Sequence, residues 1–150
     1  MVKQISQLYM EARKALCSQE DEQTASLYAR DLLCHITGKT KESLLSNLQM
    51  YASEAVCKDM EAATERLLKG EPLAYVLGQW DFHGMTLQVS PSVLIPRDDT
   101  CAVTDLAISQ ALFLDSSPRI LDLCTGSGCI GLAIAHRVKD ARGTLADISQ

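Results

Sequence analysis

A glycine-rich loop between two apolar segments, late in the chain, constrains the fold more than any other feature. The segment is Arg119-Ile-Leu-Asp-Leu-Cys-Thr-Gly-Ser-Gly-Cys-Ile-Gly131. Its first five residues, rich in leucine and isoleucine, predict a short strand that is buried on both faces. Gly126 and Gly128 allow the backbone to bend sharply and a ligand to approach closely. A helix is predicted from about Cys129, and its N-terminus favours polar or anionic ligand groups.

An acidic residue follows at the distance expected in a nucleotide-binding α/β unit. Residues 143–147 predict a second strand that ends at Asp147, about 20 residues after the loop. At this place such a unit has its acceptor for the ribose hydroxyl groups. The sequence therefore predicts a site for an adenosine cofactor.

Two adenosine cofactors are compatible with the loop. Gly126-Ser-Gly-Cys-Ile-Gly131 matches the G-x-G-x-x-G fingerprint of NAD-binding proteins, but an isolated match is weak. The segment Asp122-Leu-Cys-Thr-Gly-Ser-Gly128 resembles the first motif of S-adenosylmethionine-dependent methyltransferases, with Cys124 in place of its first glycine. A carboxylate here suits a cofactor that has an amino group and no pyrophosphate. We favour S-adenosylmethionine; a βα turn that binds nothing is the remaining alternative, and it leaves the two aspartates unexplained.

Composition and charge disfavour several other classes of protein. The chain has 150 residues, of which 47% are hydrophobic and 22% charged, and its net charge is −5. An acidic chain is poorly suited to non-specific nucleic-acid binding, which depends on Lys and Arg. No apolar run approaches the roughly 20 residues that span a membrane, and the first residues lack a signal-peptide hydrophobic segment. We therefore expect a cytoplasmic protein. The six cysteines form no C-x-x-C pair and the three histidines are scattered, so no metal site is expected.

The first 70 residues predict a helical bundle. Apolar residues recur with helical spacing in four segments, and capping residues or glycines mark most of their ends. The predicted helices are Ile5 to Leu16, a second that opens at Ser18–Asp21 and ends at Gly38, a third from Thr40 to Asn47, and a fourth that stops at Gly70. Short helices can bury their apolar faces only against one another, so residues 1–70 are expected to form one domain.

The chain then changes character twice. Residues 71–98 predict a β-hairpin with strands at 79–82 and 85–89. After it, Val93–Ile95 are predicted to be buried, and Asp99 or Thr100 to cap a helix that runs to about Leu114. Residues 99–150 give the order helix, strand, glycine loop, helix, strand, which opens a doubly wound α/β domain. About 50 residues are too few to complete such a domain, so we expect an N-terminal fragment of a longer protein.

Three motifs in this order resemble one family. They are Glu71-Pro-Leu-Ala-Tyr-Val-Leu-Gly78, Val93-Leu-Ile-Pro-Arg-Asp-Asp-Thr100 and the glycine-loop motif. Together they resemble the HemK/PrmC family, the protein-(glutamine-N(5)) methyltransferases of peptide chain release factors, over essentially the whole chain. The resemblance implies an α/β protein with a substrate-docking helical bundle (1–70), a β-hairpin hinge (71–98) and the first part of a Rossmann-like S-adenosylmethionine-dependent domain (99–150). Asp98 and Cys101 depart from the family's I-P-R-P-[DE]-T-E pattern.

The resemblance also implies roles for individual residues. The cofactor's methionine and ribose portions would lie over the loop, its amino group near the first aspartate, and its ribose hydroxyls on the second, while two further residues would border the cleft. The cofactor-binding residues are thus Asp122, Cys124, Thr125, Gly126, Ser127, Gly128 and Asp147, and the bordering residues are Pro96 and Arg97. The family's catalytic Asn-Pro-Pro-Tyr motif does not occur in this sequence, so no catalytic residue is assigned and the chain alone is expected to be inactive.

Three functions are therefore weighed. The first is methyl transfer to the side-chain amide of a release-factor glutamine. The second is a nucleic-acid amino-methyltransferase, which the acidic charge disfavours. The third is a non-catalytic docking module that keeps a vestigial cofactor fold.

Overall fold

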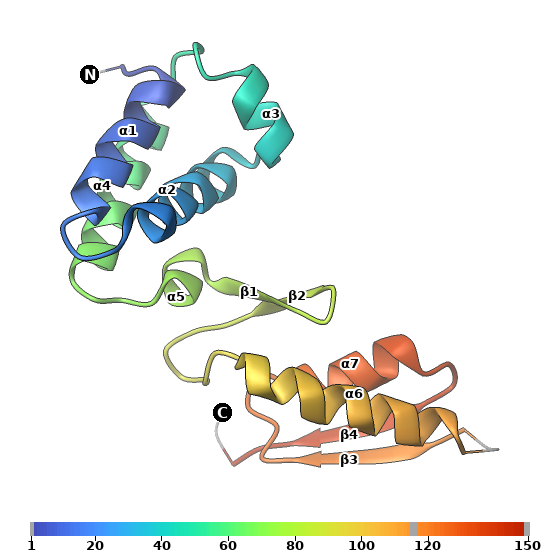
Figure 1. Ribbon diagram of the computed structural model, residues 1–150. Coiled ribbons are helices and arrows are strands. Elements are labelled where there is room, and N and C mark those ends of the chain that lie inside the picture. Colours follow the sequence, from blue (N-terminus) through green and yellow to red (C-terminus); the bar gives the residue numbers. More distant parts are fainter. Residues whose placement is uncertain (1, 115–116, 149–150) are drawn as a thin grey trace. The chain divides into compact units, whose positions relative to one another are not determined.

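The computed structural model describes residues 2–114 and 117–148, which fall into two compact units (Figure 1). The first unit extends to Leu77 and the second begins at Gly78. Each unit has its own clusters of buried apolar side chains. Mixed helices and short strands are consistent with the predicted α/β class, while the three-part division at residues 70 and 98 stays a prediction. In the described part of the chain, no helix has the length and apolar character needed to cross a membrane.

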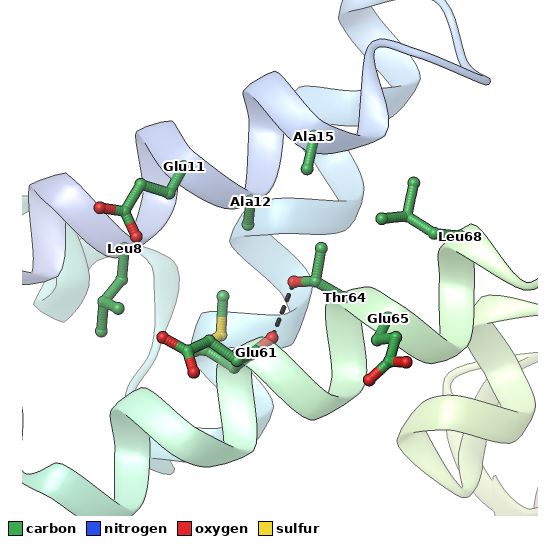
Figure 2. A pocket seen from close by; sticks show the side chains of 9 residues that line it. Leu8, Glu11, Ala12, Ala15, Glu61, Thr64, Glu65 and Leu68 are labelled. Atoms are coloured by element: carbon green, nitrogen blue, oxygen red, sulfur yellow. Dashed lines mark hydrogen bonds between the residues drawn. The ribbon is translucent and has the colours of Figure 1, made fainter.

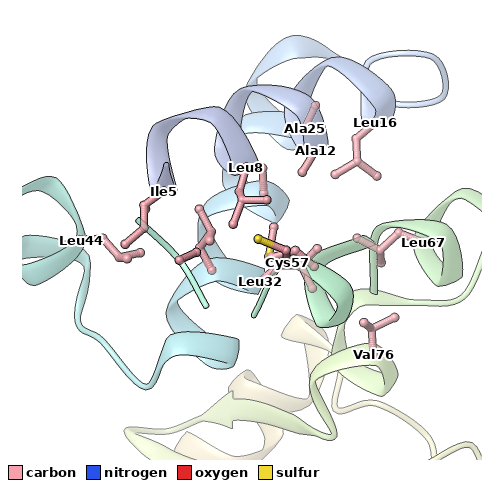
Figure 3. Close-up of a cluster of buried hydrophobic side chains, with 14 of the residues drawn as sticks. Ile5, Leu8, Ala12, Leu16, Ala25, Leu32, Leu44, Cys57, Leu67 and Val76 are labelled. Carbon is pink, nitrogen blue, oxygen red and sulfur yellow. The ribbon is translucent and has the colours of Figure 1, made fainter. Parts of the chain in front are cut away.

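The first unit is built of helices, with one isolated β-bridge between Gln4 and Tyr51 among its described residues. Its helices are α1 (Ile5–Leu16), α2 (Glu22–Thr37), α3 (Lys41–Ser46), α4 (Glu54–Leu68) and α5 (Leu73–Leu77). Helix α1 packs against both α2 and α4, and Figure 2 shows Ala12 of α1 facing Thr64 of α4. The core between the helices contains Leu8, Leu16 and Leu32, each at most 2% exposed (Figure 3). The predicted bundle of amphipathic helices is confirmed.

Polar caps fix the ends of these helices at or near the predicted residues. The Asp21 carboxylate accepts hydrogen bonds from the backbone N–H groups of Gln23 (2.8 Å) and Thr24 (3.0 Å) at the start of α2. Gly38 ends α2 in the left-handed conformation, with a φ of 63°. Thr40 caps α3 through the backbone N–H of Ser43. The capping signals in the sequence therefore identified real helix ends.

Helix α5 was not predicted from the sequence. It has five residues and follows Pro72. The Arg66 guanidinium of α4 binds the Glu71 carboxylate through two nitrogens and also donates to the backbone carbonyls of Tyr75 and Val76. These carbonyls lie at the end of α5, where a cation is favourable. A side chain of another helix thus stabilises a turn that is too short to show periodicity.

A β-hairpin opens the second unit. Strands β1 (Gln79–Phe82) and β2 (Met85–Gln88) are antiparallel, with Phe82 opposite Met85. The two turn residues between them have positive φ angles, 49° at His83 and 76° at Gly84, as type I′ hairpin turns require. The predicted hairpin is confirmed.

The remaining elements are α6 (Asp98–Leu112), β3 (Arg119–Leu123), α7 (Cys129–Arg137) and β4 (Arg142–Ala146). Strands β3 and β4 are parallel neighbours, with Asp122 opposite Leu145. Helices α6 and α7 lie on the same side of this pair (Figure 1). Ile108 and Ala111 of α6 pack with Ile134 of α7 in a small cluster that also contacts Ile120.

Two predictions of burial are wrong. Leu121 and Leu123 of β3 are 67% and 69% exposed, so within the described residues β3 is covered on only one face. Alternate residues of a strand point to opposite faces, and helices α6 and α7 cover the face of Ile120. Leu94 is 70% exposed, and its neighbours Val93 and Ile95 are only half-buried. Apolar composition alone identified the segments but not what covers them.

The predicted cap of α6 is also wrong. The helix begins at Asp98, and its N-cap residue is Arg97, whose side chain makes no capping hydrogen bond. Asp98 and Asp99 lie in the first turn instead, where their negative charge is favourable near the positive end of the helix dipole.

Candidate functional site

The glycine loop lies where the carboxyl ends of two parallel strands meet. Residues 124–128 connect the end of β3 to the start of α7. The backbone N–H of Thr125 donates to the carbonyl of Ala146, the last residue of β4, at 3.1 Å. The carbonyl of Thr125 in turn accepts from the N–H of Gly128 at 3.0 Å. In open α/β sheets, ligands bind at this edge, beyond the carboxyl ends of the strands.

The loop backbone repeatedly adopts left-handed conformations. The φ angles are 60° at Cys124, 56° at Gly126 and 78° at Gly128. A Cβ atom added to Gly126 would have no neighbour within 4 Å, so space is open beside the loop at this residue. Cys124 is exposed and takes a conformation that favours glycine. This conformation explains why the related motif has glycine at the position of Cys124.

Asp122 connects the strand, the loop and the helix. Its side chain is half-buried, and Oδ2 accepts hydrogen bonds from the Thr125 hydroxyl (2.7 Å) and from the backbone N–H of Gly131 (2.9 Å). Charge-assisted hydrogen bonds of this kind are stronger than neutral ones. One oxygen of the Asp122 carboxylate is therefore engaged in holding the loop against α7, which leaves Oδ1 as the atom for any ligand contact.

Asp147 holds the loop from the second strand. It follows β4 directly, and its Oδ2 accepts a hydrogen bond from the backbone N–H of Gly126 at 2.8 Å. The side chain is exposed. The two aspartates that sequence spacing selected thus meet at one loop, although they are far apart in the chain. The contact with Gly126 was not anticipated, because the sequence predicted only a role toward ribose hydroxyl groups.

Gly131 is a site residue that the sequence interpretation did not assign. A Cβ atom at this position would lie 2.2 Å from Cδ2 of Leu145 and 3.1 Å from Oδ2 of Asp122. The side chains of Leu145 and Asp122, as they lie in the structure, therefore leave no room for a Cβ atom in the first turn of α7. The signal was present in the sequence, since the third glycine of G-x-G-x-x-G serves close packing of helix and strand.

The other predicted residues are less closely connected. Ser127 is half-buried within the loop. Pro96 is buried, and Arg97 is exposed at the start of α6. Among the residues that the structure describes, neither of these two has a hydrogen bond or ion pair to the loop. Their place at the border of a cleft stays a prediction.

The charged side chains around the loop limit the kinds of ligand group that it can bind. Between Asp122 and Gly131 there is no Lys or Arg, whereas two carboxylates converge on the loop. The Asp122 carboxylate would be a poor neighbour for a pyrophosphate, whereas an acidic residue in the place of Asp147 also occurs in dinucleotide-binding units. The two carboxylates are acceptors that suit an amino group and ribose hydroxyls, and the preference for S-adenosylmethionine over NAD stays a prediction. The described residues contain no group of three or more side chains arranged to hold a metal ion.

Comparison with known sequences finds relatives that are named as methyltransferases. Residues 7–78 match the profile of the PrmC N-terminal domain. Over 130 residues the chain is 36% identical to the release factor glutamine methyltransferase of Vibrio cholerae, an alignment that covers 87% of this chain and 45% of that protein. The proteins of the same name from Haemophilus influenzae and Escherichia coli K12 are 40% identical over 127 residues and 34% identical over 129 residues. These two alignments cover 82% and 85% of this chain and 44% and 46% of the relatives.

The chain therefore spans about half the length of the curated relatives that it matches. The similarity extends beyond the helical unit, because these alignments cover more than four fifths of the chain. The family resemblance predicted from the three motifs is thus confirmed: the chain is a homologue of the release factor glutamine methyltransferases, and its residues 7–78 belong to the PrmC N-terminal domain family.

Proposed function

We propose that this chain provides the docking module and the first half of the S-adenosylmethionine site of an enzyme that methylates a glutamine side-chain amide in peptide chain release factors. The observation that carries the proposal is the convergence of Asp122 and Asp147 on one left-handed glycine loop. The names of the relatives support the substrate, because they are release factor glutamine methyltransferases.

Each part of the loop has a role in this proposal. S-adenosylmethionine supplies an activated methyl group when it is bound. The backbone of residues 124–128 would lie beneath its methionine and ribose portions, and Oδ1 of Asp122 would accept from its amino group. The Asp147 carboxylate accepts from the ribose hydroxyls. Pro96 and Arg97 border the cleft that admits the substrate.

Methyl transfer requires residues that this sequence does not contain. An amide nitrogen is a weak nucleophile, so its alignment and its electrostatic environment must supply much of the rate. By the family resemblance, an Asn-Pro-Pro-Tyr motif performs this alignment, and no such motif occurs among the 150 residues. We therefore expect the chain alone to bind the cofactor weakly and to transfer no methyl group.

Cofactor binding tests the proposed site directly. Calorimetric titration of the chain should show binding of S-adenosylmethionine and none of NAD. We expect Asp147→Ala to weaken the binding about tenfold or more, the cost of about 1.5–3 kcal/mol for losing a charged hydrogen-bond acceptor. Asp59→Ala removes another exposed carboxylate, from α4, and is the control. Asp147→Asn tests the negative charge of Asp147 separately from its contact with the loop. The amide oxygen of asparagine still accepts from the N–H of Gly126, while the charge is lost.

A chimera with a curated relative tests the choice of substrate. A chimera of this chain with the remaining part of the Vibrio cholerae relative should transfer radiolabelled methyl groups to a release factor. Labelled DNA with an unlabelled release factor would overturn the proposal in favour of a nucleic-acid methyltransferase. Binding of NAD in place of S-adenosylmethionine would overturn the assignment of the cofactor.

A further inference from the structure

Thr125 makes hydrogen bonds through its backbone and also through its side chain. Its backbone N–H donates to the carbonyl of Ala146 in β4, and its own carbonyl accepts from the N–H of Gly128. Its hydroxyl donates to Oδ2 of Asp122 at 2.7 Å. The backbone contacts fix the turn, and other residue types could make them equally well. The contact with Asp122 depends on the hydroxyl, so this group has a role beyond the shape of the loop.

Asp122 is held through one of its two carboxylate oxygens. Oδ2 accepts from the Thr125 hydroxyl and from the backbone N–H of Gly131, at 2.7 and 2.9 Å. Among the residues that the structure describes, none donates a hydrogen bond to Oδ1. An aspartate side chain has several rotamers, and its terminal torsion is broad. Two donors on the same oxygen select one orientation of the carboxylate and leave Oδ1 as the acceptor for a ligand.

The segment offers few side chains that could replace the Thr125 hydroxyl. Residues 122–131 contain no Lys, Arg, His, Asn or Gln, and the other hydroxyl of the segment belongs to Ser127. In the described part of the chain, no hydrogen bond joins Ser127 to Asp122. Loss of the Thr125 hydroxyl would therefore leave the Gly131 N–H as the donor to Oδ2. A carboxylate with one donor can rotate, so its orientation would no longer be fixed.

The two acidic side chains of the site come from different strands. Asp122 belongs to β3, whereas Asp147 follows β4 and accepts from the N–H of Gly126. The Thr125 hydroxyl is committed to the first of them. In the proposed function, Asp122 serves the amino group of the ligand and Asp147 its ribose hydroxyls. A change at the Thr125 hydroxyl should therefore affect recognition of the amino group and leave recognition of the ribose intact.

We infer that Thr125 is a positioning residue that makes the site selective for ligands with an amino group. Its hydroxyl holds Asp122 in the orientation in which Oδ1 accepts from the ligand's ammonium group, and it does not contact the ligand itself. Hydrogen bonds weaken steeply when their geometry is lost, so a rotating carboxylate would bind the ammonium group less well. The inference rests on the proposed function for the class of ligand.

Two thioethers of adenosine separate the amino group from the rest of the ligand. S-adenosylhomocysteine has an amino acid on its sulfur atom, whereas methylthioadenosine has only a methyl group there. Calorimetric titration of the chain with each compound gives the ratio of the two affinities. Thr125→Val removes the hydroxyl and keeps the shape of the side chain. We expect it to weaken the binding of S-adenosylhomocysteine about tenfold, as the loss of a charge-assisted hydrogen bond does, and to leave the binding of methylthioadenosine unchanged.

Three further variants identify the hydroxyl as the cause. Thr125→Ser keeps the hydroxyl and should restore the wild-type ratio of affinities. Thr125→Ala also removes the hydroxyl, and it takes the place of Thr125→Val if thermal unfolding shows that valine disturbs the fold. Thr144→Val is the matched control and should change neither affinity. Thr144 is exposed in β4 opposite the exposed Leu121, on the face that α6 and α7 do not cover.

Decarboxylated S-adenosylmethionine distinguishes the amino group from the carboxylate of the ligand. This compound keeps the amino group, so Thr125→Val should weaken its binding as well. A loss confined to ligands that have a carboxylate would overturn the inference.

Equal weakening of the two thioethers by Thr125→Val would overturn the inference, because the hydroxyl would then support the loop as a whole. An unchanged affinity for S-adenosylhomocysteine would overturn it too. In both cases the wild-type chain still binds these compounds, so the proposed function stands. Binding of neither thioether by the wild-type chain would reject the proposed cofactor site, and the role of Thr125 with it.

Discussion

Gly131 determines how closely α7 approaches β4. Its backbone N–H donates to Asp122, and a Cβ atom would be only 2.2 Å from Cδ2 of Leu145. The backbone of α7 or the side chain of Leu145 must therefore move in the Gly131→Ala variant. Leu145 is 41% exposed and can turn away, whereas Asp122, 3.1 Å from the added Cβ, is held by two hydrogen bonds. We therefore expect this substitution to lower the free energy of unfolding of the second unit by about 1 kcal/mol, the low end of the usual cost of overpacking. Urea unfolding followed by circular dichroism measures it.

Gly143→Ala is the matched control for this prediction. Gly143 lies in β4, and a Cβ atom there would meet nothing within 4 Å. Its φ is outside the left-handed region, so alanine fits and the substitution should be neutral or slightly stabilising. If both substitutions destabilise the protein equally, close packing is not the reason for Gly131.

At single residues, the sequence predicted identities better than contacts. Spacing selected Asp122 and Asp147, and the structure brings both to the glycine loop. The sequence did not indicate that each carboxylate forms a hydrogen bond with the loop, because these contacts depend on the left-handed backbone at Cys124 and Gly126. Such a conformation follows from the whole turn and is not a property of one residue type.

Among the helices, the start of α2 has the clearest dependence on pH. Hydrogen bonds, the strongest from the Thr24 hydroxyl, hold the pKa of Asp21 below its ordinary value of 3.8. A lowered carboxyl pKa means that the folded state favours the ionised form. The stabilisation is therefore complete above this ordinary value, which holds in the unfolded chain, and is lost as the pH falls through the lower folded pKa.

Asp21→Asn isolates this contribution. Asparagine still caps a helix but does not ionise, so we expect the variant to have a lower thermal unfolding midpoint than the wild type at pH 6. The difference should disappear as the pH is lowered from 4 toward about 2. Thermal unfolding followed by circular dichroism across this range measures it, and a difference that is independent of pH would contradict the assignment.

Whole elements were predicted well where the signal is local and poorly where it is not. Caps and glycines located the ends of α2 and α3, and the residue pair at 83–84 located the hairpin turn. Helix α5 depends on the Arg66 side chain of another helix, which no local pattern reveals. The position of β3 was predicted correctly, but the sequence did not show that, within the described residues, helices α6 and α7 cover only one of its faces.

The apolar core of the molecule is divided between its two units. All members of the largest cluster, from Ile5 to Val76, belong to the helical unit. The second unit has two small clusters and leaves Leu121 and Leu123 exposed. Stability from apolar burial grows with the area removed from water. The helical unit should therefore be the more stable of the two.

This division predicts two unfolding transitions in a calorimetric scan, with the second unit melting first. Leu8→Ala removes a side chain that is 2% exposed in the helical core. It should reduce the free energy of unfolding of the helical unit by about 2–5 kcal/mol and lower the temperature of the second transition only. Ile134→Ala removes a side chain that is 4% exposed in α7. It should lower only the midpoint temperature of the first transition, in which the second unit unfolds. Hydrogen exchange would assign each transition to its residues. A single transition shifted by both substitutions would mean that the units unfold as one cooperative body, because sites in separate units do not share the energy of one core.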